Sequence, residues 1–134
     1  MSQLSLVELN RFVRRVLALN FPEAIWVEAE VAHVNESRGH FYLRLVQKAA
    51  DNDQLLAQAE ARLWSSQLPA LRREHGRKVT DVLRVGVKLR LQVSPAFHEC
   101  FGFSLTVLNL DPSYTEGQLE IARRQTLEQL QLSG

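Results

Sequence analysis

The sequence contains only one cysteine, Cys100, and no cysteines in a CxxC spacing. An internal disulfide is therefore impossible, and a zinc site built from cysteine pairs is excluded. Long apolar runs are absent too: none approaches the roughly 20 residues of a membrane span. Near the N-terminus, Arg11, Arg14 and Arg15 lie where a signal peptide would need its apolar core. We therefore expect a reduced, soluble protein of the cytoplasm that does not contact a membrane.

Motifs of known catalytic chemistry are missing as well. The chain has no Gly-rich phosphate loop, no GxSxG and no HExxH, and its carboxylates lack the spacing that holds metal ions for phosphodiester cleavage. His98 and Cys100 offer two metal ligands, fewer than a site requires. We therefore predict no catalytic residue, no metal and no cofactor within this sequence.

Overall charge is low, because 16 Lys and Arg residues face 15 Asp and Glu residues, for a formal net charge of +1. The distribution is uneven, however. The segment from Arg62 to Arg90 contains eight basic and two acidic residues, whereas Glu23, Glu28, Glu30 and Glu36 make the first predicted strand acidic. Any binding to nucleic acid must therefore depend on a local basic surface rather than on a global field.

A helix is predicted over residues 5–19. Apolar side chains recur there with the 3.6-residue helical period, at Leu6, Leu9, Phe12, Val13, Val16 and Leu17. Ser5 and Glu8 have the spacing of a capping box, in which each side chain satisfies a free backbone N–H of the first turn. Phe21-Pro22 ends the segment.

Apolar and polar residues then alternate in five segments, which predicts five strands: 25–31, 40–45, 57–64, 87–93 and 103–107. A short helix is expected between the third and fourth strands, near Pro69, and a loop from Pro95 to Gly102. Helical spacing returns over 116–132. We predict a mostly β fold, a five-stranded Greek-key OB-fold barrel with an N-terminal helix (1–22), the barrel itself (23–113) and a C-terminal helix (114–134). Other small five-stranded barrels share this element order.

If the apolar set of each strand fills the barrel, the other set faces outward and is available to a ligand. OB-fold barrels bind oligonucleotides on strands two and three and on the loops between strands one and two and strands four and five. Aromatic rings there can stack on bases, and cationic groups can meet phosphates. The predicted nucleic-acid-binding residues are His40, Tyr42, Arg44, Arg62, Trp64, Lys88 and Arg90 on strands, with Phe97 and His98 in the last loop. The competing interpretation is that these are ordinary polar exteriors and that Trp64 packs under the next helix.

Several short motifs support a family assignment. Leu6-Val7-Glu8-Leu9-Asn10-Arg11, Trp26-Val27-Glu28-Ala29-Glu30-Val31, Gly39-His40-Phe41-Tyr42-Leu43 and Gly117-Gln118-Leu119 occur in that order. Together they resemble the N-terminal OB-fold domain of the large subunit of exodeoxyribonuclease VII. The chain departs from the family at Val7, Ala29 and Leu45-Val46-Gln47, where serine, glycine and a Leu-Lys-Asp type of sequence are usual.

The resemblance implies a part in an exodeoxyribonuclease that degrades single-stranded DNA from its ends. The family's catalytic domain follows this region, and a later helical part binds the small subunits, so the present residues are expected to be inactive alone. Capture of single-stranded DNA for that nuclease is the leading functional hypothesis. Two alternatives stay open. One is an interaction or positioning module that holds the nuclease core or a second subunit, including a second copy of itself, through its terminal helices. The other is an RNA-binding OB domain.

Overall fold

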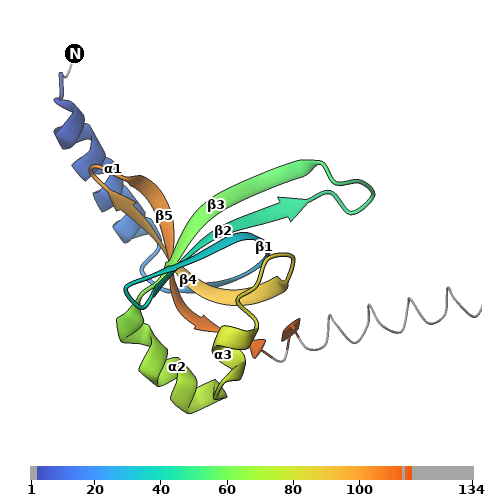
Figure 1. The fold of residues 1–134 in the computed structure, drawn as a ribbon. Helices are drawn as coiled ribbons and strands as arrows, with labels where there is room; N and C mark the ends of the chain where they lie inside the picture. Colours follow the sequence, from blue (N-terminus) through green and yellow to red (C-terminus); the bar gives the residue numbers. More distant parts are fainter. Residues whose placement is uncertain (1–2, 113, 116–134) are drawn as a thin grey trace, which may run out of the picture.

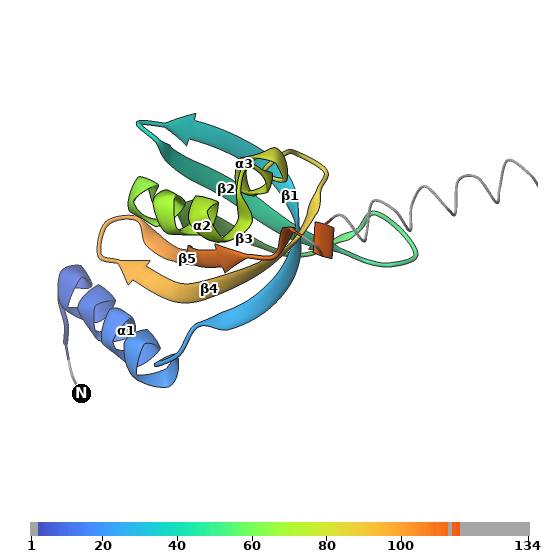
Figure 2. The same ribbon diagram turned by 90° about the horizontal axis from the view of Figure 1, so that it is seen from below.

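The computed structural model describes residues 3–112, 114 and 115. The elements are α1 (Leu6–Asn20), β1 (Ile25–Ser37), β2 (His40–Lys48), β3 (Leu55–Leu63), the 3-10 turn η1 (Ser65–Gln67), α2 (Leu68–His75), α3 (Lys78–Asp81), β4 (Lys88–His98) and β5 (Gly102–Leu110). Figure 1 shows α2 and α3 beneath the barrel, and both views place α1 outside it, beside the β4–β5 hairpin (Figure 2). The predicted C-terminal helix, apart from Tyr114 and Thr115, lies outside the described residues.

The five strands form a closed barrel in the order β1-β2-β3-β5-β4. Every pairing is antiparallel except that of β3 with β5, which is parallel at Ala61 and Leu105. The long β1 closes the barrel because it pairs with β4 through Ile25 to Glu30 and with β2 through Glu30 to Ser37, with an irregularity between Val31 and His33. The predicted OB-fold barrel is confirmed.

The barrel is filled by the inward set of each strand. Leu43, Leu63, Leu89, Leu91 and Val107 are at most 1% exposed. The segment between β3 and β4 contributes to the same core through Leu68, Leu71 and Val79, so α2 and α3 close the lower end of the barrel. The helix predicted near Pro69 is confirmed as α2, and the short α3 follows it. Outward residues of the barrel are therefore held on strands whose other side packs in this core.

Apolar residues at strand ends were wrongly assigned to the core. Ile25 is 40% exposed, Phe103 is 48% exposed, and Ala57 is also exposed. The β2–β3 hairpin projects beyond the barrel, as Figure 1 shows, so the first residues of β3 have no opposite wall to pack against. Alternation identified the strands but not where they leave the core.

Helix α1 begins as predicted, with both hydrogen bonds of the Ser5 and Glu8 capping box, at 3.2 and 3.3 Å. Its apolar stripe nevertheless does not join the core, because no residue of α1 is buried. Val13 and Leu17 are half-buried, whereas Leu9, Phe12, Val16 and Leu19 are 40–75% exposed. The helix therefore presents a second apolar face to solvent.

Candidate nucleic-acid interface

Three aromatic side chains from β2 and the end of β3 gather on one face of the barrel. The ring of His40 lies 5.0 Å from Trp64 and 6.4 Å from Tyr42, and Tyr42 lies 6.3 Å from Trp64, all edge to face. The Ser65 backbone N–H donates to His40 Nδ1 at 3.0 Å, which holds the imidazole in place. The β2–β3 hairpin explains the cluster, because Phe41 pairs with Leu63 and Tyr42 with Arg62.

Arg62 links this cluster to the β4–β5 hairpin. Its guanidinium lies 5.9 Å from the Trp64 ring centroid and 5.8 Å from that of Phe101, distances at which a cation is attracted to an aromatic ring. Among the described residues, no carboxylate forms an ion pair with Arg62. We call His40, Tyr42, Arg62, Trp64 and Phe101 the aromatic face.

A cross-strand row supports the aromatic face. Tyr42 on β2 pairs with Arg62 on β3, Arg62 with Thr106 on β5, and Thr106 with Ser94 on β4. These side chains share one side of the sheet because directly paired residues point the same way. The aromatic face thus lies on β2 and at the end of β3, the row continues beside it onto β5 and β4, and Phe101 is at its edge.

The turn between β4 and β5 is tighter than predicted. β4 continues to His98, so Phe97 is a half-buried strand residue paired with Phe103 rather than part of a loop. The aromatic at the tip is Phe101, which is 71% exposed; it lay within the predicted loop but was not among the predicted binding residues. Gly102, at φ +80°, ends the turn, because glycine adopts this region of φ without strain.

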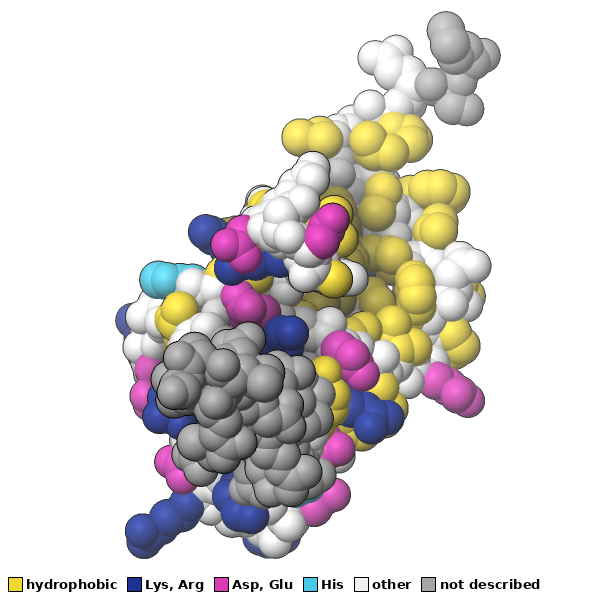
Figure 3. Space-filling model, turned by 90° about the vertical axis from the view of Figure 1, so that its right-hand side faces the viewer, with side chains coloured by type: hydrophobic (Ala, Val, Ile, Leu, Met, Phe, Trp, Pro, Cys, Tyr) yellow, Lys and Arg dark blue, Asp and Glu magenta, His cyan; other side chains and the backbone are white. Residues whose placement is uncertain are grey.

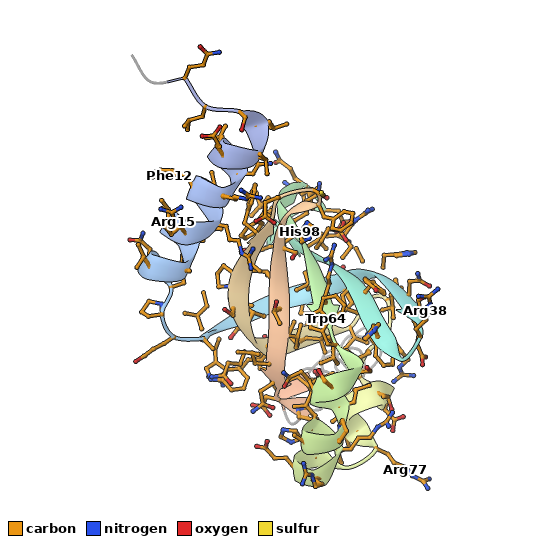
Figure 4. All side chains as sticks on the ribbon, turned by 90° about the vertical axis from the view of Figure 1, so that its left-hand side faces the viewer. Phe12, Arg15, Arg38, Trp64, Arg77 and His98 are labelled. Carbon is orange, nitrogen blue, oxygen red and sulfur yellow. The ribbon has the colours of Figure 1, made fainter. Side chains whose placement is uncertain are left out.

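His98 organises this turn from its base. Its Nδ1 accepts hydrogen bonds from the backbone N–H groups of Cys100 at 3.0 Å and Phe101 at 3.4 Å. The imidazole also stacks on the Phe101 ring, with centroids 4.6 Å apart and planes 27° apart. His98 (labelled in Figure 4) therefore supports Phe101. It is the last residue of β4 rather than a loop residue, and its predicted contact with nucleic acid stays a prediction.

Arg44 lies beside the aromatic face but is paired with a carboxylate. Its Nε donates to Glu60 Oε1 at 3.0 Å, directly across the β2–β3 ladder, and both side chains are 54% exposed. Exposed pairs of this kind are weak. Arg44 can still reach a phosphate, but Glu60 opposes the approach of an anion.

Lys88 and Arg90 do not join the aromatic face. They lie on β4 opposite Glu30 and Glu28 of β1, and the Arg90 guanidinium lies 5.4 Å from the Trp26 ring centroid. Burial, the charge of Glu28 and a hydrogen bond with Glu28 raise the pKa of Tyr114 here, while Arg90 lowers it. The basic middle segment is therefore divided, because the start of β4 pairs with the acidic half of β1.

A groove of about 980 Å³ adjoins this second face. Carboxylates of Glu28, Glu30, Asp51 and Asp53 line it together with Lys48 and Lys88, and Lys48 Nζ lies 3.2 Å from Glu30 Oε2. Such a lining disfavours phosphate. Within the described part of the chain, no three His, Cys, Asp or Glu residues are placed to hold a metal ion, and no helix is long and apolar enough to cross a membrane.

Comparison with known proteins agrees with this architecture. Residues 4–111 match the family described as OB-fold nucleic acid binding domain. The chain belongs to this family. This OB-fold domain is also 36% identical over 118 residues to the exodeoxyribonuclease 7 large subunit of Deinococcus radiodurans, which confirms the resemblance found in the motifs.

The matched region is 85% of this OB-fold domain's chain but only 28% of that relative's length. Among solved structures, the chain is similar to a mitochondrial single-stranded DNA binding protein of S. cerevisiae, with 9% identity and a TM-score of 0.38, over 66% of this chain and 88% of the other.

Proposed function

We propose that this OB-fold domain binds single-stranded DNA along the aromatic face. The observation that supports the proposal most directly is Arg62, a cation held between the rings of Trp64 and Phe101 without a carboxylate partner among the described residues. Bases can stack on the rings, and the guanidinium can meet a phosphate or stack on a base itself. These contacts read ring faces and backbone charge, so binding is expected to tolerate many sequences.

The similarity to an exodeoxyribonuclease large subunit suggests where the bound strand goes. We propose that the domain belongs to such an enzyme in the cytoplasm and captures DNA for a nuclease domain encoded outside these residues. Small subunits would join the enzyme through other regions. We propose that cleavage of the DNA is carried out by that nuclease domain and not by the OB-fold domain.

A salt-dependent titration tests the proposal. Fluorescence anisotropy of labelled oligo-dT with the purified chain should give binding at low salt that weakens as salt rises, with a slope of about −0.7 per phosphate contact on a single strand. Oligo-rU of equal length provides the parallel measurement for RNA. Absence of binding to oligo-dT at low salt would overturn the proposal, and clearly tighter binding to oligo-rU would replace DNA by RNA as the ligand.

A second candidate function, self-association, is favoured by the exposed face of α1. Leu9, Phe12, Val16 and Leu19 follow the alternating three- and four-residue spacing of a coiled-coil seam, and each is at least 40% exposed. Figure 4 shows Phe12 pointing away from the barrel, and Figure 3 shows hydrophobic side chains gathered along α1 and onto the adjoining surface. We call these four residues the α1 seam.

A second copy of the chain is the occupant that the α1 seam fits. In an antiparallel pair, Leu9 of each helix faces Leu19 of the other and Phe12 faces Val16, so the seam is complementary to itself about a twofold axis. Phe21, Ile25 and Trp26, each at least 39% exposed, extend the apolar surface toward the roughly 800 Å² per partner of a standard interface. Arg15 flanks the seam and would lie near its twofold mate.

Sedimentation at increasing concentration tests self-association. The dimer should strengthen with salt, because screening weakens the repulsion between the Arg15 side chains while apolar burial is maintained. DNA binding has the opposite salt dependence, so the two functions separate in one salt series. Phe12→Glu should give a monomer, whereas Arg15→Gln should strengthen the dimer. A wild-type chain that stays monomeric at every concentration and salt overturns this candidate.

A further inference from the structure

Helix α1 is attached to the β4–β5 turn by two contacts that span the sequence. Asn10 Nδ2 donates to the backbone oxygen of Glu99 at 2.9 Å, across 89 positions. The Arg14 guanidinium donates to Glu99 Oε1 at 3.1 Å, across 85 positions. The Glu99 carboxylate also accepts a hydrogen bond from the Glu99 backbone N–H. This bond and the bond from Arg14 lower the pKa of Glu99. The side of α1 that bears Asn10 and Arg14 thus serves the turn, while the α1 seam faces elsewhere.

The turn in question is the one that presents Phe101. Glu99 lies between His98, whose Nδ1 accepts the N–H groups of the next two residues, and the exposed ring of Phe101. That ring stacks on His98 at 4.6 Å and lies 5.8 Å from the Arg62 guanidinium. A continuous set of contacts therefore runs from α1 through Glu99 and Phe101 to Arg62.

We infer that Asn10, Arg14 and Glu99 are positioning residues, through which α1 fixes the β4–β5 turn so that Phe101 is held beside Arg62 before a nucleic acid arrives. An exposed turn without such an anchor opens at little free-energy cost. Ordering it would then fall on the binding step and weaken affinity. This inference rests on the proposed binding of single-stranded DNA, and it gives α1 a part in recognition although α1 lies outside the barrel.

A charge swap tests the attachment. Arg14→Glu, Glu99→Arg and the double variant are compared with the wild type for oligo-dT affinity at one salt concentration. Arg11→Glu is the matched control, because it makes the same charge change on the same helix and Arg11 forms no ion pair with Glu99. The double variant keeps the wild-type net charge and can rebuild the pair in reverse. Its affinity should exceed the value expected from the two single variants by about two- to fivefold, the coupling of an exposed ion pair.

A structural readout accompanies the titration. Nuclear Overhauser contacts between the His98 and Phe101 rings should weaken in Arg14→Glu and return in the double variant, while the melting temperature of the barrel stays constant because α1 adds nothing to the core. Arg11→Glu should keep these contacts.

The outcomes distinguish this inference from the function on which it rests. If the wild-type chain fails to bind oligo-dT at low salt, the proposed DNA binding and the positioning role are both overturned. The titration of the wild type alone gives this result. Wild-type binding with no coupling between positions 14 and 99, or ring contacts that persist in Arg14→Glu, overturns the inference and leaves the proposed function in place.

Discussion

Two arginine–tryptophan pairs lie on different faces of the same barrel. Arg62 lies 5.9 Å from the Trp64 ring on the aromatic face, and Arg90 lies 5.4 Å from the Trp26 ring on the β1–β4 face. The pairs are nearly alike in geometry but differ in their neighbours. A second aromatic ring, Phe101, flanks Arg62, whereas Arg90 has Glu28 directly across the ladder.

On the proposed function, we expect a cation near a ring to bind nucleic acid only where no carboxylate opposes it. Around Arg90, the carboxylates of β1 supply the negative charge that a phosphate would otherwise bring, so an incoming strand gains little and meets repulsion. Around Arg62, the described residues place no carboxylate in an ion pair, and the exposed ring of Phe101 and the half-buried ring of Trp64 lie beside the guanidinium. The two pairs therefore form a natural set of matched variants.

The largest difference is expected between the two tryptophans. Trp64→Ala should weaken oligo-dT binding by about 1–3 kcal/mol, roughly fivefold to more than a hundredfold, because a stacked base loses its ring. Trp26→Ala, 44% exposed in the wild type, should leave the affinity almost unchanged. Anisotropy titrations at fixed salt give both values.

Phe101→Ala controls for loss of affinity through misfolding in the tryptophan variants. The Phe101 ring is 71% exposed, so its removal does not open the core. It should weaken binding in the same range as Trp64→Ala. Equal losses for Trp26→Ala and Trp64→Ala, with Phe101→Ala silent, would place the ligand away from the aromatic face.

The two arginines should differ in the salt dependence of binding. Arg62→Ala removes a phosphate contact, so the slope of log affinity against log salt should become shallower by about 0.7. Arg90→Ala removes the same formal charge but should leave that slope unchanged. A salt series on each variant measures this, and a shift of the slope by Arg90→Ala alone would reverse the assignment of the two faces.

Local pairing explains what the sequence could predict. The alternation over β2 and β3 and the polar break between them are enough to place Tyr42, Arg62 and Trp64 together, because a hairpin pairs neighbouring segments. The capping box at Ser5 and the helix near Pro69 follow from equally local signals.

Long-range pairing explains what it could not. Glu28 lies opposite Arg90 because β1 pairs with β4 to close the barrel. The two residues are more than 60 positions apart in the chain, so no local pattern predicts the pair. Pro95 suggested a loop, yet it lies within the β4–β5 ladder opposite Leu105, and this shifted the tip of the hairpin from Phe97 to Phe101. The amphipathic spacing of α1 likewise predicts an apolar side of the helix, but not whether the barrel or another molecule packs against that side.

A smaller effect is expected from the carboxylate next to the aromatic face. Glu60→Gln should strengthen oligo-dT binding by about two- to threefold, because it releases Arg44 from its ion pair and removes a repulsive charge. Glu28→Gln removes the same charge on the β1–β4 face and should change affinity less. If Glu60→Gln and Glu28→Gln strengthen binding equally, the gain comes from the change in net charge and not from the release of Arg44.

The smallest effect concerns pH and separates α1 from the barrel. Hydrogen bonds from Ser5 lower the pKa of Glu8 below its ordinary value of 4.5, and those from its own backbone and Arg14 do the same for Glu99. A lowered folded-state pKa means that the stabilisation is present above about pH 4.5 and is lost as the pH falls through the lower folded-state value. Hydrogen exchange should therefore show α1 amides losing protection on acidification before those of the barrel strands.

Glu8→Gln should make the cap insensitive to pH, since glutamine preserves the capping box. If α1 and the barrel strands lose protection at the same pH, α1 does not unfold separately from the barrel.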